Sequence, residues 1–125
     1  MTTNSPVSIN VESEYLKDHS EPQANRHVFA YTVTICNDGL ENVQLLSRHW
    51  LITDGKNKVQ EVKGEGVIGE QPTIEPGSQF SYTSSAMLET STGTMEGSYQ
   101  MLSQSGENFD TPIPLFMLSR PGALH

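Results

Sequence analysis

The residues that could do chemistry begin with segment 64–69, which has the sequence GEGVIG and the spacing Gly-x-Gly-x-x-Gly. In dinucleotide-binding proteins this spacing cradles a pyrophosphate between a preceding strand and the N-terminus of a following helix. Residues 59–63 could supply the strand, but Pro72 and Pro76 follow closely after Gly69. Because proline breaks a helix interior, no helix can open on these glycines. The sequence therefore excludes a dinucleotide site of this type.

Two other interpretations of residues 64–69, the glycine segment, stay open. Backbone N–H groups of a glycine-rich loop can form a concave anion site without a helix. The chain's only basic cluster lies directly before the segment in the sequence. A weakly bound phosphate, nucleotide or protein partner would then contact Lys56, Lys58, Lys63, Gly64, Gly66 and Gly69. We favour the simpler interpretation, in which the glycines permit positive φ in a long loop and the lysines solvate an edge strand.

No other residues have a spacing typical of catalysis or metal binding. The four histidines, His19, His27, His49 and His125, are never two or four positions apart, and the single cysteine, Cys36, is not paired with them. The sequence contains neither a Gly-x-Ser-x-Gly elbow nor a His-Glu-x-x-His helix motif. We therefore predict that the protein is not an enzyme and that it carries no metal and no cofactor.

The charge of the chain restricts its partners. A formal net charge of −8 repels the phosphate backbone, so we predict no nucleic-acid binding and no docking on anionic lipid. No apolar run approaches the roughly 18 residues of a membrane span, so we predict no membrane insertion. With a single cysteine and no signal peptide visible, we expect a cytoplasmic protein without an internal disulfide.

Hydrophobic alternation predicts the elements that must position these residues. Seven segments alternate between turn signals, and they are residues 7–15, 27–36, 43–54, 59–63, 79–88, 93–102 and 109–118. Pro112 and Pro114 confine the last strand to a sheet edge or a bulged path. Residues 64–77 form one long irregular connection, and residues 1–6 and 119–125 form loose tails. The pattern predicts a single all-β domain over residues 1–125, an immunoglobulin-like or fibronectin type III-like antiparallel sandwich, with a small barrel as the alternative.

The buried face of the strand over residues 43–54 is undecided, because Leu45 and Leu46 are apolar on both faces. If Trp50 faces inward, it is a core residue, as mid-strand tryptophan usually is in sandwiches. If Leu45 faces inward by strict alternation, Trp50 and Arg48 lie outside and offer a surface to a protein partner. Homodimerisation through an edge strand also stays open.

Three blocks of sequence resemble the bacterial ApaG family. They are SRHWLITD at residues 47–54, GEGVIGEQP at residues 64–72 and MEGSYQM at residues 95–101, and the resemblance extends from about Val7 to Leu118. The resemblance implies a fibronectin type III-like or immunoglobulin-like sandwich that acts as a non-catalytic binding or protein-interaction module. It also implies a link to cobalt resistance and magnesium efflux. Because ApaG genes often neighbour that of a diadenosine tetraphosphate hydrolase, it implies as an alternative a nucleotide or polyphosphate sensor that uses the glycine segment.

Overall fold

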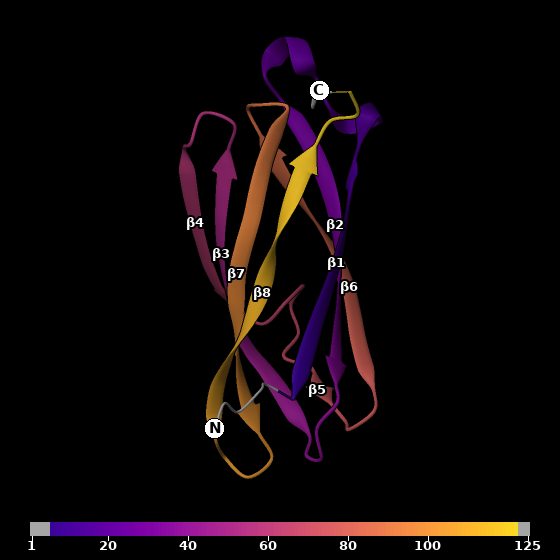
Figure 1. Ribbon diagram of the computed structural model, residues 1–125, viewed down its shortest axis with the longest axis vertical. Helices are drawn as coiled ribbons and strands as arrows, with labels where there is room; N and C mark the ends of the chain where they lie inside the picture. Colours follow the sequence, from indigo (N-terminus) through magenta and orange to yellow (C-terminus); the bar gives the residue numbers. More distant parts are fainter. Residues whose placement is uncertain (1–5, 123–125) are drawn as a thin grey trace.

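A computed structural model describes residues 6–122, which form two antiparallel sheets packed face to face (Figure 1). The three-stranded sheet has the order β1-β2-β6, with β1 at Val7–Tyr15, β2 at His27–Asn37 and β6 at Gln79–Leu88. The five-stranded sheet has the order β4-β3-β7-β8, with β5 beside β3. Its strands are β3 (Val43–Asp54), β4 (Val59–Glu65), β5 (Thr73–Ile74), β7 (Thr92–Ser103) and β8 (Asn108–Ser119). The two separate sheets confirm the predicted sandwich and exclude the barrel.

The strand boundaries agree with the predicted ones to within one residue at each end, except around the glycine segment. The connection after β4 is not irregular throughout, because it contains a tight turn and the short strand β5. The loop between β1 and β2 contains two 3-10 turns, η1 (Lys17–His19) and η2 (Pro22–Ala24). Neither these turns nor any other helix in residues 6–122 is long and apolar enough to cross a membrane. Residues 1–5 and 123–125, most of the predicted tails, lie outside the described residues.

Strand β8 follows the path that its prolines impose. It pairs only with β7 within its sheet, and its register shifts opposite the step from Met95 to Gly97. The shift sets Ile113 against Gly97 and Phe116 against Met95, so Pro114 falls in the irregular part. The prediction of a bulged edge strand is confirmed.

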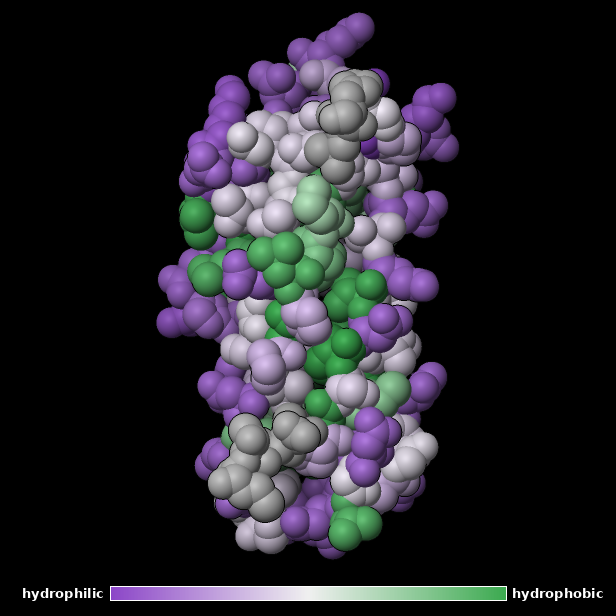
Figure 2. All heavy atoms as spheres, in the orientation of Figure 1, coloured by the Kyte–Doolittle hydropathy of each residue, from purple (hydrophilic) through white to green (hydrophobic). Residues whose placement is uncertain are grey.

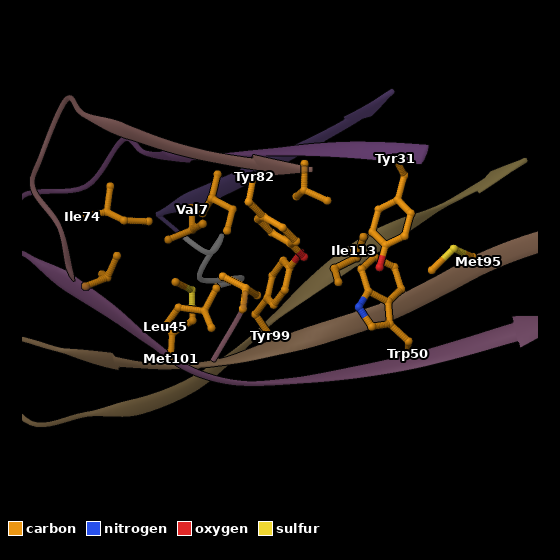
Figure 3. Packing of buried hydrophobic residues seen from close by; sticks show 14 of the residues in the cluster. Val7, Tyr31, Leu45, Trp50, Ile74, Tyr82, Met95, Tyr99, Met101 and Ile113 are labelled. Atoms are coloured by element: carbon orange, nitrogen blue, oxygen red, sulfur yellow. The ribbon is translucent and has the colours of Figure 1, made fainter. Parts of the chain in front are cut away.

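The core lies between the sheets and is rich in aromatic residues. Strand β2 alternates strictly between buried and half-buried positions, and the aromatic and aliphatic residues on its buried side, Phe29, Tyr31, Val33 and Ile35, face the second sheet. Opposite them lies Trp50, which is 2% exposed and makes edge-on ring contacts with Tyr31, Tyr99 and Phe116. Figure 3 shows Trp50 and Tyr31 from the two sheets in contact inside the sandwich.

Trp50 therefore faces the core, and the hypothesis that it forms an exposed partner surface with Arg48 is wrong. The physical reason is a β-bulge, since the pairing of β3 with β7 shifts register between Leu45 and Ser47. The extra residue, Leu46, allows both Leu45 and Trp50 to face the core although they are five positions apart. Arg48 lies two positions before Trp50 and shares its side of the strand. Its guanidinium lies against Gly64 of β4 and does not project into solvent as part of a stripe.

Candidate functional site

The glycine segment ends in a two-residue β-turn. The N–H of Val67 donates to the carbonyl of Glu70 at 2.8 Å, and the N–H of Glu70 donates back to the carbonyl of Val67 at 2.9 Å. The two central residues, Ile68 and Gly69, have φ values of 43° and 79°. Positive φ at both central positions defines a type I′ turn. Val67 is 1% exposed, so its side chain anchors this Val67–Glu70 turn in the core.

The bulge in β3 holds the Val67–Glu70 turn in place. The carbonyl of Leu46, the extra residue, accepts hydrogen bonds from the N–H of Gly66 and from the side-chain amide of Gln71, both at 2.8 Å. Arg48 donates through Nη1 to the carbonyl of Glu65 at 3.1 Å and to that of Gly66 at 2.8 Å. The segment on both sides of the turn is thus bonded to one strand.

Each of the three glycines meets a different structural requirement. A Cβ on Gly64 would lie 2.7 Å from the guanidinium carbon of Arg48, so the missing side chain makes room for the arginine. Gly66 has a φ of 61°, and a Cβ there would lie 2.1 Å from the carbonyl oxygen of Glu70. Gly69 needs only its positive φ, because a Cβ would meet nothing within 4 Å. The positive φ values at Gly66 and Gly69 are those that the simpler interpretation of the segment expects.

The structure brings together only part of the predicted anion site, which was to combine three lysines with the backbone of the glycine segment. Lys56 and Lys58 lie at the turn from β3 to β4, and the glycine segment lies at the other end of β4 (Figure 1). The seven residues of β4 span about 20 Å at about 3.3 Å per residue. In addition, the N–H groups of Gly66, Val67 and Glu70 already donate to carbonyls of the chain. Of the three predicted lysines, only Lys63 lies beside the glycine segment.

Lys63 borders a shallow polar hollow beside β3 and β4. The hollow has a volume of about 430 Å³ and is lined by Ser47, Arg48, His49, Lys63, Gly64, Glu65 and Gln100. His49 Nε2 lies 2.6 Å from a carboxylate oxygen of Glu61, and Lys63 Nζ lies 3.9 Å from the same oxygen. The side chains that line the hollow therefore include both hydrogen-bond donors and acceptors.

Three buried tyrosines, Tyr31, Tyr82 and Tyr99, lie in the core near enough to Arg48 to interact electrostatically with it. Tyr82 from one sheet and Tyr99 from the other are joined through their hydroxyl groups (Figure 3). Burial raises the pKa of Tyr82 to about 12, and burial together with the neighbouring Tyr82 raises the pKa of Tyr99. The pKa of Tyr31 is also raised by burial. These hydroxyls are therefore neutral at physiological pH and serve as hydrogen-bonding groups.

The raised pKa of Tyr82 predicts alkaline destabilisation. An unfolded tyrosine ionises near pH 10, whereas folded Tyr82 keeps its proton to about pH 12. Its contribution to stability is complete below pH 10 and is lost as the pH rises through 12, with a magnitude of about 3 kcal/mol. Urea unfolding followed across this range should show the loss, and Tyr82→Phe should reduce the dependence on pH. Equal pH dependence in both proteins would contradict this assignment.

The residue that sequence reasoning missed is Ile68. It is 57% exposed at the tip of the Val67–Glu70 turn, and β-branched residues rarely adopt positive φ. A signal was present, because a two-residue loop ending in glycine is typical of a type I′ turn. The type I′ turn was missed because residues 64–77 were predicted as one long irregular connection. Among residues 6–122 no group of three or more His, Cys, Asp or Glu side chains could hold a metal ion.

Comparisons with known proteins agree with the fold and place the chain in a family. The family model described as the ApaG domain matches residues 17–103. Protein ApaG of Azotobacter vinelandii is 57% identical over 119 residues, which are 95% of this chain and 94% of that protein. Protein ApaG of Pseudomonas aeruginosa (strain LESB58) is 55% identical over 123 residues, which are 98% of each chain. A crystal structure from Bordetella pertussis shares 45% of its sequence and has a TM-score of 0.91, covering 93% of this chain and 94% of its own. The chain belongs to the ApaG domain family.

Proposed function

We propose that the protein is a non-catalytic, cytoplasmic interaction module that binds a protein partner through the Val67–Glu70 turn. One observation carries the proposal, namely that a half-exposed isoleucine, Ile68, occupies a backbone conformation suited to asparagine or glycine. The turn around it is fixed by buried Val67 and by Arg48, so a partner would meet a preformed apolar tip.

The energetics of Ile68 support a contact outside the chain. An L-residue in the left-handed region costs about 1–2 kcal/mol, and a β-branched side chain is among the least suited to it. Because 57% of Ile68 remains exposed, burial of its side chain within the chain offsets little of this strain energy. Strain held by the surrounding structure is typical of binding sites. A partner that buries Ile68 would account for isoleucine at this position.

The test is the substitution Ile68→Asn, which creates the Asn-Gly pair preferred in type I′ turns. We expect Ile68→Asn to unfold at higher urea concentration than the unchanged protein, with a gain of about 1 kcal/mol. We also expect it to lose the protein that the unchanged chain captures from a native lysate, as measured by quantitative mass spectrometry. Loss of capture by a more stable variant cannot result from unfolding.

The matched control is Met87→Asn, because Met87 on β6 is 58% exposed and lies away from the turn. Capture should survive this substitution. A partner retained by Ile68→Asn, or lost equally from both variants, would contradict the proposal.

Calorimetry distinguishes the alternative function, a nucleotide or polyphosphate sensor, from the protein-interaction module. Titration with ATP and diadenosine tetraphosphate should give no heat of binding, because the turn's N–H groups are largely occupied. Saturable binding that Lys63→Ala weakens would favour the nucleotide or polyphosphate sensor in place of the interaction module. The link to cobalt resistance and magnesium efflux, within this proposal, acts indirectly through the protein partner.

A further inference from the structure

Strand β4 is a free edge of the five-stranded sheet. Within residues 6–122 its only partner strand is β3. Five of its seven residues are exposed, and Val62 and Gly64 are half-buried. An edge of this kind presents unpaired N–H and C=O groups to any extended chain. Figure 1 shows β4 along one side of the molecule, with no strand beyond it.

The hydrogen-bonding pattern restricts how a second copy could pair with β4. In an antiparallel pair, directly opposed residues must both point their backbone groups at the partner or both point them away. For two copies of one strand, the two-fold axis must therefore pass through a residue position. With the axis at Val62, the midpoint of Val59–Glu65, all seven residues of each copy are paired. Moving the axis to Glu61 or to Lys63 leaves two residues of each strand without partners in the other copy.

The charges of β4 select the same register. With the axis at Val62, Glu61 of each copy faces Lys63 of the other, and opposite charges directly across an antiparallel pair stabilise it. With the axis at Glu61, the Glu61 carboxylates of the two copies would face each other. With the axis at Lys63, the two lysines would face each other and Glu61 would face Glu65. Only the register that pairs the whole strand also pairs unlike charges.

We propose that two copies of this chain associate through β4 in this register, which joins their five-stranded sheets into one continuous sheet. Val62 of each copy lies at the axis on the inner side, and the Glu61–Lys63 pairs lie on the outer side. The contact within one chain between Glu61 and Lys63 at 3.9 Å shows that the two side chains already lie on one face. The net charge of −8 on each chain opposes association, and physiological salt screens this long-range repulsion.

Analytical ultracentrifugation of the full chain across a concentration series at physiological salt tests the proposal. We expect a reversible monomer–dimer equilibrium. Glu61→Lys and Lys63→Glu, made singly, place like charges across the axis twice and should each raise the dissociation constant about tenfold or more. The double variant Glu61→Lys, Lys63→Glu restores unlike pairs and should recover the original dissociation constant. Glu75→Lys, an equal charge change on the exposed segment after β5, is the control and should not weaken the dimer.

The outcomes separate clearly. A chain that stays monomeric throughout the series overturns the proposal. Single variants that dimerise as tightly as the unchanged protein, or a folded double variant that does not recover, overturn the register and with it the proposal. Circular dichroism confirms that each variant is folded, and the two single variants are independent should one of them fail to fold. Ile68→Asn lies outside β4 and should leave the dimer intact, which separates this result from the test of the partner-binding turn.

Discussion

Replacing Gly66 by alanine should lower the free energy of unfolding by about 3–4 kcal/mol. Two costs add at this position. Alanine at a φ of 61° costs about 1–2 kcal/mol, and a Cβ placed 2.1 Å from the carbonyl oxygen of Glu70 forces the backbone apart. Movement there would strain the hydrogen bonds that tie Gly66 to Leu46 and Arg48. Urea denaturation followed by circular dichroism measures the loss.

Gly69→Ala is the matched control for this prediction. Gly69 has a φ of 79° but open space around it, so alanine should cost only about 1–2 kcal/mol. If the glycines served only to admit an anion, the two substitutions would cost about the same, because each would carry only the cost of positive φ. Equal small losses at both positions would contradict the view that the glycine segment is a packed turn.

Trp50→Ala should cost about 3–5 kcal/mol, the largest effect of any single truncation that we predict. The side chain is 2% exposed and touches aromatic rings from both sheets, so its removal leaves a cavity at the centre of the sandwich. Trp50→Phe should cost much less, because it keeps an aromatic ring. It also removes an indole N–H that has no hydrogen-bond partner among the described residues.

The measurement is again the free energy of unfolding, with Leu51→Ala as the neighbour control. Leu51 faces the opposite side of β3 and is only half-buried, so its truncation should cost far less than that of Trp50. Similar losses at Trp50 and Leu51 would mean that Trp50 is not a central core residue.

Most of the fold was predictable because strict alternation determines which face of a strand is buried. The segments 7–15, 43–54 and 79–88 were predicted at the boundaries that the structure shows. The face of β3 was not predictable, because a bulge changes the parity between Leu45 and Trp50 and leaves no local signal in two adjacent leucines. Strand β5 has only two residues, too few for any periodicity.

The candidate site was predictable in position but not in geometry. The glycine spacing and its prolines located the segment and excluded a helix. Sequence proximity wrongly suggested that Lys56 and Lys58 accompany it, because a strand carries chain neighbours apart by its full length. The role of Arg48 depends on the same bulge that placed Trp50, so it could be recognised only with the strand pairing known.

The most direct test of partner binding by the Val67–Glu70 turn is site-specific photo-crosslinking in living cells. A photoreactive phenylalanine analogue at position 68 should give a discrete crosslinked product with one protein. The same analogue at position 87 or position 40, where Met87 and Leu40 are at least as exposed, should not give it. No product from position 68, or the same product from all three positions, would contradict the assignment of this turn as the partner-binding surface.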